Sequence, residues 1–323
     1  MRFSVILGNL GNTCDRFLSS GYKDQPSKAE MFRQAAGIEG VSGIELVGTW
    51  DVTTENVAEV GALLTDNGMR CASIIPDHFS QKRWGRGAFT ARDPDIRRLA
   101  VQVAREMMDV AVELGCDLVN LWPGQDGYDY CFQGDFLHAR DWLIDGIRQC
   151  AEHRPDVRIA LEYKPKEPRT HSYIARASDT LLLAMETGCD TVGVTIDFGH
   201  ALMAGENVAE SAAMLARHDK LYHMHFNDNY RTWDDDMIVG SVHLVEYVEL
   251  LHWLRKLDYA GWWSMDQYPY REDARAAISE SVRWLAALDG RLSRQAPGRF
   301  DELIASGDAT RASAAIREFL GLT

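Results

Sequence analysis

Residues 193–200 read GVTIDFGH, a short apolar and β-branched run that ends in an acidic residue and, three residues later, a histidine. An unbroken run of this kind is typical of a strand that is buried on both faces, as in a parallel sheet. Asp197 closes the run, and a buried carboxylate costs several kcal/mol unless it is paired or bound to a metal. The stretch therefore predicts a buried strand whose end faces a polar site.

Similar runs recur along the chain, and longer amphipathic segments such as Asp95–Leu114 and Phe136–His153 separate them. The eight predicted strands are Phe3–Leu7, Gly43–Leu46, Arg70–Ile75, Leu118–Trp122, Arg158–Glu162, Gly193–Ile196, Leu221–Phe226 and Gly261–Met265. Alternation of strands and helices implies parallel strands with crossover helices. Eight units in about 285 residues fit an α/β fold of the (β/α)₈ TIM-barrel type. Two Rossmann halves fit less well, because no GxGxxG follows the first strand.

The alternation of helical and strand patterns also predicts where helices end and where the domains meet. Gly115, Gly188 and Gly261 each lie between a helical pattern and the next strand, where a C-cap glycine is expected. From about Leu288 onward the pattern becomes helical and charged, and it ends in Ala309–Leu320. We therefore predict a barrel domain over residues 1–287 and a C-terminal helical arm over residues 288–323.

The composition limits the kinds of partner. The 323 residues carry a formal net charge of −14, which opposes a nucleic-acid partner, because such partners are bound by Lys and Arg. The six cysteines show no CxxC spacing, which favours a reducing, cytoplasmic setting. No apolar run approaches 18 residues, and Met1 leads directly into a predicted strand, so neither a membrane span nor a signal peptide is expected.

Four successive strands end in residues that bind metals. Glu162 ends the fifth strand, Asp197 follows the sixth, His225 ends the seventh and Asp266 follows the eighth. Strand ends of a barrel point into one active site, so these side chains are expected to converge. Three carboxylates and one imidazole suit Mn²⁺, Mg²⁺ or Co²⁺, and Zn²⁺ is compatible with the same set. We predict that they bind one divalent cation.

A second set of ligands follows in the chain. Asp234 and Asp236 stand two residues apart, so on an extended loop they face the same way and could chelate one ion. His200 could add a nitrogen, with Asp197 bridging the two ions. An acidic triplet alone is usually a solvated loop, and a lone histidine is usually only hydrogen-bonded. The number of ions, one or two, therefore stays open at this point.

Several motifs resemble known families. Residues 162–169, EYKPKEPR, resemble the Glu-x-Lys-Pro-x-Glu-Pro signature of the xylose isomerase and L-rhamnose isomerase families. Residues 199–205 are similar to the Gly-His-x-x-Met-Ala-Gly run of xylose isomerases, and residues 122–127, WPGQDG, resemble a segment that lines their sugar site. Residues 225–228 and 234–241 look closer to L-rhamnose isomerase. The resemblance spans roughly residues 70–285.

This resemblance implies roles for the residues at the strand ends. The structural, substrate-anchoring ion would be held by Glu162, Asp197, His225 and Asp266. The catalytic ion would be held by His200, Asp234 and Asp236. Lys164 would face the carbonyl oxygen of the substrate. The chain departs from xylose isomerases at residues 43–50, where no histidine stands near the place of their ring-opening His–Asp pair. The identity of the sugar is therefore open.

The predicted activity is aldose–ketose isomerisation of a small sugar by a metal-assisted hydride shift. Lys164 would donate to the developing oxyanion, although an ion pair with a carboxylate would also explain it. Trp122, Phe79 and Trp84 are candidates for a dry wall beside the reacting carbons, or they are ordinary packed aromatics. His78 is a candidate for ring opening, although a hydrogen bond to Asp77 is the simpler interpretation.

Three alternatives remain. The first is a ketose 3-epimerase, which uses one ion and an acid–base pair of glutamates, but Asp266 is shorter than a glutamate. The second is a DNA-repair endonuclease on a related barrel, which the acidic charge opposes. The third is an inactive barrel that only binds a partner, which the intact ligand set opposes. We also expect the chain to form a homo-oligomer, a dimer or tetramer, through the helical arm.

Overall fold

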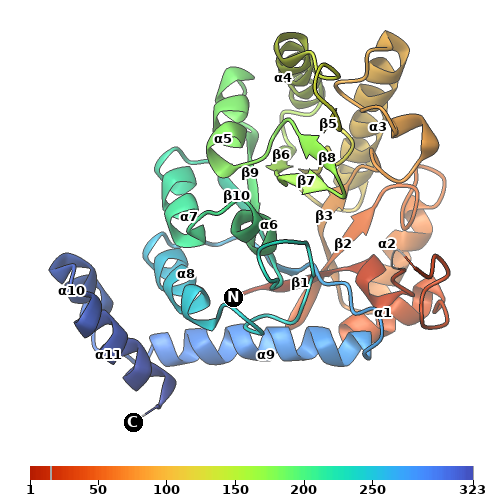
Figure 1. Cartoon of the computed structure of the whole chain (residues 1–323). Coiled ribbons are helices and arrows are strands. Elements are labelled where there is room, and N and C mark those ends of the chain that lie inside the picture. Colours follow the sequence, from red (N-terminus) through yellow and green to blue (C-terminus); the bar gives the residue numbers. More distant parts are fainter. Residues whose placement is uncertain (15–16, 323) are drawn as a thin grey trace.

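The computed structural model describes residues 1–14 and 17–322. Eight parallel strands close into a barrel in the order β1-β11-β10-β9-β6-β4-β3-β2, and helices surround it (Figure 1). The barrel strands are β1 (Phe3–Ile6), β2 (Val41–Val47), β3 (Arg70–Ile75), β4 (Leu118–Leu121), β6 (Arg158–Glu162), β9 (Val192–Asp197), β10 (Leu221–Phe226) and β11 (Trp263–Met265). Each coincides with a predicted strand to within a few residues, so the (β/α)₈ TIM barrel is confirmed.

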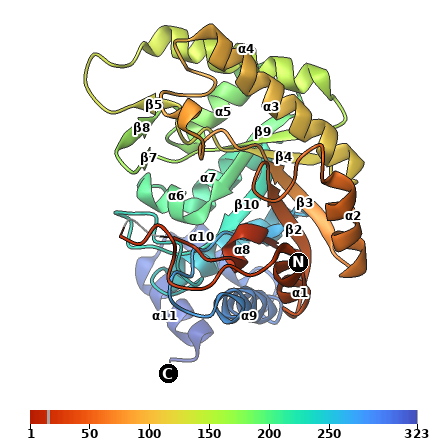
Figure 2. The same cartoon turned by 90° about the vertical axis from the view of Figure 1, so that its right-hand side faces the viewer.

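The helices pack outside the barrel, where Figure 2 shows α3 and α4 lying side by side and α9 seen end-on at the bottom of the view. They are α1 (Lys28–Ala36), α2 (Val57–Asp66), α3 (Pro94–Glu113), α4 (Phe136–His153), α5 (Ala177–Glu186), α6 (Phe198–Met203), α7 (Val208–Arg217), α8 (Leu244–Lys256), α9 (Ala274–Leu292), α10 (Arg299–Ser306) and α11 (Ala309–Leu320), with short 3₁₀ helices η1 (Leu7–Leu10) and η2 (Lys82–Trp84). Within residues 1–14 and 17–322, no helix has both the length and the apolar character that a membrane span requires.

The strands are buried on both faces, but the two faces differ in chemistry. Along β10 the polar side chains of His223 and His225 alternate with Met224, and all three are fully buried. The same alternation places Ser4, Glu45, Ser73 and Ser264 on one face, where hydrogen bonds join Ser4 to Ser264, Ser73 to Glu45 and Ser264 to Glu45. The barrel interior is therefore a polar network, whereas the apolar residues of the strands pack against the helices.

Two of the three predicted helix-ending glycines are confirmed. Gly115 and Gly188 follow α3 and α5 with φ of 68° and 70°, in the left-handed region that glycine adopts without strain. The prediction for Gly261 is wrong, because α8 ends at Lys256 and the left-handed residue after it is Asp258, with φ of 50°. A Cβ at Gly261 would lie 2.3 Å from the Tyr259 hydroxyl, so this glycine makes room for a side chain.

The C-terminal arm consists of α10 and α11. Helix α9 runs unbroken past residue 288, so the predicted domain limit falls inside it and the separate helices begin at Arg299. Phe319 of α11 is 2% exposed, and its ring meets Phe300 of α10 edge-on at 5.9 Å. Phe300 in turn lies 5.4 Å from the ring of His252 on α8. The arm is thus attached to the barrel helices through a small aromatic cluster.

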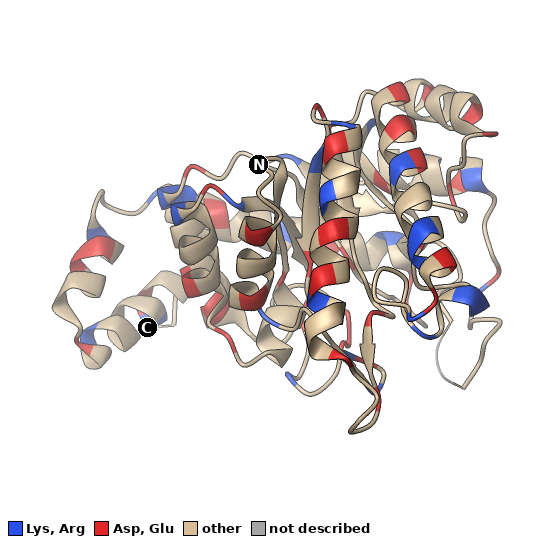
Figure 3. Cartoon of the chain, turned by 90° about the horizontal axis from the view of Figure 1, so that it is seen from above, with Lys and Arg blue, Asp and Glu red and all other residues tan. Residues whose placement is uncertain are grey.

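Charged side chains are mixed on the outside of the barrel. Lys and Arg alternate with Asp and Glu along the outer helices (Figure 3). Most of the resulting ion pairs are between exposed partners such as Arg283 and Glu280, and pairs of this kind contribute little to stability. The fold therefore depends on its buried layers rather than on these surface contacts.

Replacement of Phe319 by alanine tests how the arm is attached. Loss of a buried aromatic ring is expected to weaken docking of the arm by about 3–5 kcal/mol. Limited proteolysis should then cut within residues 299–322 faster, while the melting of the barrel stays unchanged. Leu322→Ala is the matched control, because Leu322 is 62% exposed in the same segment. Equal cleavage rates in the two variants would contradict this attachment.

Candidate metal centre

The carboxyl ends of the barrel strands surround a cavity of about 300 Å³. Six of the seven predicted metal ligands line it, together with Lys164 and several aromatic side chains. The lining ligands are Glu162, His200, His225, Asp234, Asp236 and Asp266. The seventh, Asp197, is fully buried at the end of β9 behind this surface. The parallel topology therefore gathers residues that are up to 104 positions apart (162 to 266) around one space.

The first ligand group lies at the ends of four strands. Glu162, Asp197, His225 and Asp266 each offer one ligand atom, and these four atoms lie within 4.8 Å of one another. His225 Nδ1 is 3.2 Å from Asp266 Oδ2 and 3.5 Å from Glu162 Oε1. The arrangement brings three oxygens and one nitrogen to a common point, as the order of the strand ends predicts.

The second ligand group consists of Asp197, His200 and Asp234, whose ligand atoms also lie within 4.8 Å of one another. Asp197 is the N-cap of α6, where its Oδ1 accepts a hydrogen bond of 2.7 Å from the backbone N–H of His200. This first helical turn directs the His200 ring toward Asp234, with His200 Nε2 3.1 Å from Asp234 Oδ2. Asp197 thus belongs to both groups.

Asp236 lies beside the two groups. Its Oδ1 is 3.3 Å from Asn227 Nδ2, and the same amide nitrogen donates at 2.7 Å to Asp197 Oδ2. Asp236 has a positive φ of 48°, a conformation in which the loop turns its side chain into the cavity beside Asp234. The expectation that Asp234 and Asp236 face the same space is met.

The charges of these residues oppose one another. Burial, together with the charges of Asp234, Asp266 and Glu162, raises the pKa of Asp197 to about 7, against the lowering effect of His200. Burial lowers the pKa of His200, but the charges of Asp197 and Asp234 outweigh it and raise this pKa to about 9. Carboxylates this close together require positive charge among them.

Three buried atoms of these groups fit a cation. Among the residues that the structure describes, none offers a hydrogen-bond partner to His200 Nδ1, His225 Nδ1 or Asp234 Oδ1. Buried polar atoms are normally paired, yet each imidazole nitrogen lies 3.2–3.5 Å from carboxylate oxygens without hydrogen-bond geometry. Ligand atoms that converge without hydrogen bonds between them suit a divalent cation. The mostly oxygen ligands fit Mn²⁺, Mg²⁺ or Co²⁺.

Lys164 lies just past the end of β6 and is almost completely buried. Its Nζ forms ion pairs with Asp234, at 2.6 Å, and with Glu167. Burial lowers its pKa, but the charges of Asp234 and Glu167 outweigh burial and hold this pKa well above the usual value. The ammonium also lies 5.2 Å from the centre of the Trp122 ring. Lys164 is therefore a charged donor at the cavity wall, and the ion pair considered from the sequence is present as well.

Two of the three aromatic side chains expected to form a dry wall line the cavity. The Trp122 and Phe79 rings lie 4.7 Å apart, and Trp50 meets Phe79 edge-on at 5.6 Å. Trp84 does not belong to this wall, because it is 1% exposed and packs in the core. Its assignment to the wall is therefore wrong.

His78 lies outside the cavity lining. Its ring packs edge-on against Trp84 and Phe89, and Nε2 lies 2.9 Å from the carbonyl oxygen of Ala100. Burial lowers the pKa of His78 to about 4. Asp77 accepts hydrogen bonds from Thr49 and Ser80 rather than from His78. The geometry therefore gives no support to the predicted role of His78 in ring opening.

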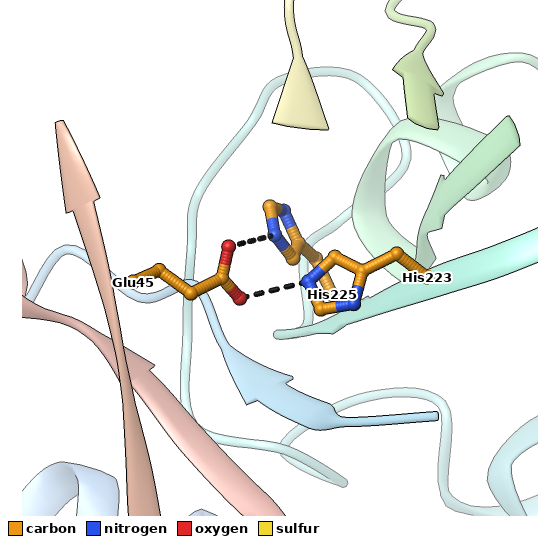
Figure 4. A group of neighbouring side chains, drawn as sticks. All are labelled: Glu45, His223 and His225. Carbon is orange, nitrogen blue, oxygen red and sulfur yellow. Dashed lines mark hydrogen bonds and ion pairs between the residues drawn. The ribbon is translucent and has the colours of Figure 1, made fainter. Parts of the chain in front are cut away.

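Sequence reasoning missed a second polar group, formed by Glu45, His223 and His225, which Figure 4 shows in the barrel interior. Glu45 accepts from His223 Nε2 at 2.8 Å and from His225 Nε2 at 3.4 Å. The signal was available, because a glutamate in the middle of a buried strand is as costly as Asp197 at the end of one.

Comparisons with known proteins agree with this architecture. A family model described as the xylose isomerase-like TIM barrel matches residues 32–288. Xylose isomerases of Thermus thermophilus and Thermus caldophilus are 29% and 30% identical over 221 and 222 residues, or 67% of this chain. The match spans 57% of the length of these relatives. The resemblance to xylose isomerases inferred from the motifs is confirmed.

Solved structures of sugar epimerases share the fold. A 3-keto-D-glucoside 4-epimerase from E. coli is 19% identical with a TM-score of 0.67, covering 88% of this chain and 99% of its own. An L-ribulose 3-epimerase is 14% identical with a TM-score of 0.68, covering 94% and 97%. At such low identity the likeness concerns the fold alone.

The affinity for Mn²⁺ is predicted to rise with pH. A bound cation needs the free lone pair of His200, which carries a proton below its pKa of about 9, and the ionised form of Asp197, which is protonated below about 7. Affinity should therefore increase about tenfold per pH unit for each proton released. Calorimetric titration of the metal-free protein between pH 6 and pH 8 measures this slope.

His138→Gln is the control for that titration, because His138 is an exposed histidine paired with Asp135 on α4, away from the cavity. The same slope is expected in this variant. An affinity that does not change with pH would contradict the assignment of buried, protonated ligands.

Proposed function

This chain belongs to the xylose isomerase-like TIM barrel family, and we propose that it is an aldose–ketose sugar isomerase that binds two divalent cations. One observation carries the proposal: Asp197 contributes to both buried ligand groups. A carboxylate has two oxygens, so one side chain can bridge two ions. Paired ions suit a reaction that moves a hydrogen between adjacent carbons, because both neighbouring oxygens of the sugar must be held.

The ligand groups divide between the two cations. Glu162, Asp197, His225 and Asp266 would hold the ion that anchors the sugar. Asp197, His200, Asp234 and Asp236 would hold the catalytic ion. When bound, the ions supply Lewis-acid polarisation of the sugar carbonyl and a template for its two oxygens. Mn²⁺, Mg²⁺ and Co²⁺ fit the oxygen-rich ligands, and Zn²⁺ is compatible with the two imidazoles.

The residues of the chain have three tasks in this reaction. The Lys164 ammonium donates a hydrogen bond to the sugar oxygen on which negative charge develops. Its ion pairs with Asp234 and Glu167 keep it protonated and aimed into the cavity. Trp122 and Phe79 exclude water beside the reacting carbons, so the hydrogen on C2 moves with its electron pair to C1 without exchange. The hydroxyl proton passes from O2 to O1, which balances the isomerisation.

A ketose 3-epimerase is the second candidate, and the first ligand group supports it, because that group is complete without the second ion. Several of the solved structures with this fold are epimerases by name. Epimerisation would need Glu162 and Asp266 as an acid–base pair on opposite faces of the sugar. Asp266 has the shorter side chain, and the second group of ligands would have no task.

We also propose that the partner is a small sugar and that the chain forms a dimer or tetramer. The cavity of about 300 Å³ matches a single monosaccharide rather than a chain of sugars. Self-association is supported by exposed aromatic side chains at the N-terminal end of α4, those of Tyr130, Phe132 and Phe136.

Replacing Asp234 and Asp236 together by asparagine separates the two activities. Asparagine keeps the size of the side chain and removes the charge that balances the cation, so affinity for the second ion should fall by ~100-fold or more. Aldose–ketose turnover, measured with a panel of aldoses and Mn²⁺, should be abolished. Calorimetry should show that one Mn²⁺ per chain remains bound.

Asp235→Asn is the matched control, because Asp235 stands between the two and accepts a hydrogen bond from the Tyr230 N–H. It should keep both ions and full turnover. A double variant that retains its turnover with one ion per chain before and after the change would overturn the isomerase and favour the epimerase.

A further inference from the structure

Glu45 is an acidic residue in the middle of β2, fully buried in the barrel interior. It reaches His223 and His225, which are 178 and 180 residues further along the chain on β10 (Figure 4). In the closed barrel, β1 and β11 separate β2 from β10, so the contact crosses the interior rather than joining neighbouring strands. Nothing in the proposed reaction uses this carboxylate directly, because it does not line the cavity.

Four neighbouring side chains donate hydrogen bonds to the two carboxylate oxygens of Glu45. Ser264 and His223 donate to Oε1, and Ser73 and His225 donate to Oε2. The carboxylate is therefore ionised and accepts hydrogen bonds on both oxygens.

The two nitrogens of His225 face different groups. Nε2 lies 3.4 Å from Glu45 Oε2, whereas Nδ1 lies 3.2 Å from Asp266 Oδ2 and 3.5 Å from Glu162 Oε1. An ionised carboxylate can only accept, so the nitrogen beside Glu45 must carry a proton. An imidazole that binds a cation is neutral and has one proton, so the lone pair is left on Nδ1, the nitrogen among the ligands of the first cation.

We propose that Glu45 is a positioning residue that keeps the proton of His225 on Nε2 and so leaves Nδ1 free to bind the first cation. This inference rests on the first cation site of the proposed function. A carboxylate behind a metal-binding histidine fixes the ring and raises its basicity, and loss of such a partner lowers metal affinity by about 10- to 100-fold. His223 holds the other oxygen of Glu45, so the carboxylate cannot turn away from His225.

A third cation among Glu45, His223 and His225 is the competing interpretation, since their ligand atoms also lie within 4.8 Å of one another. The hydrogen bonds oppose it. Oε1 and Oε2 each accept from two donors, and His223 Nε2 is 2.8 Å from Oε1, a distance that a shared proton explains. The atoms by which these three side chains face one another are therefore paired without an ion.

Glu45→Gln tests the inference. The amide keeps the size of the side chain, but it lacks the charge and presents an N–H₂ group on one side. Affinity for the first Mn²⁺, measured by calorimetry on the metal-free full-length protein, should fall about 10- to 100-fold. Ser73→Ala is the matched control, because it removes another donor to the same carboxylate and touches no cation ligand. It should lower the melting temperature of the metal-free protein and leave Mn²⁺ affinity within about threefold of wild type.

The outcomes separate this inference from the proposed function. Wild-type protein that binds no Mn²⁺ would overturn both. Binding that is equal in wild type and Glu45→Gln would overturn the positioning role alone, as would equal losses in Glu45→Gln and Ser73→Ala. Loss of a third equivalent of Mn²⁺ in Glu45→Gln would make Glu45 a ligand instead.

A second measurement does not depend on the folding of a variant. Nitrogen–proton correlation spectra of ¹⁵N-histidine-labelled protein saturated with Mg²⁺ report which ring nitrogen carries the proton. Through-bond correlation of each ring with its own assigned backbone amide identifies the signals of His225. A proton on Nε2 is expected, and a proton on Nδ1 would overturn the inference.

Discussion

Five carboxylates meet at the mouth of this barrel, and their mutual repulsion is the constraint on which the site depends. Glu162, Asp197, Asp234, Asp236 and Asp266 share a small volume with two imidazoles and one ammonium group. Like charges so close together cannot all ionise without compensation. Burial, and then the charges of the neighbouring carboxylates, raise the pKa of Asp197 to about 7. Divalent cations compensate this charge more completely than protons do, because one ion accepts lone pairs from several ligands at once.

The polar interior of the barrel supports that centre. Asn120 donates a hydrogen bond to Glu162 and accepts one from Thr195. Glu162, at the end of β6, is therefore held by buried side chains of the neighbouring strands. Asn227 holds Asp197 and Asp236 together, and Asp228 anchors the start of the loop by accepting from the backbone and ring of His243. Glu162, Asp197 and Asp236 thus each have a buried amide partner that fixes the direction of the side chain. Such support keeps the ligands in place before a cation arrives, which favours binding.

Much of the fold and of the ligand set was predictable from the sequence, for physical reasons. Each barrel strand is a compact apolar run, and the ends of parallel strands converge, so Glu162, Asp197, His225 and Asp266 could be placed together before any coordinates. The loop after β3 was not predictable in this way, because tertiary packing decides that His78 and Trp84 turn into the core. The link between Glu45 and His225 crosses the barrel, and local patterns carry no information on it. The small sheet of β5 (Gly127–Tyr128), β7 (Lys166–Glu167) and β8 (Thr170–Ser172) is too short to leave a periodic signal.

Asp197 is the side chain that both ligand groups share. Diffraction from crystals grown with Mn²⁺, recorded for its anomalous scattering, tests this sharing most directly. Two anomalous peaks are predicted, each about 2.0–2.6 Å from its ligand atoms. Asp197 should contact both ions, either through one shared oxygen or through one oxygen to each ion. A single peak bound only by Glu162, Asp197, His225 and Asp266, or peaks away from Asp197, would contradict the account.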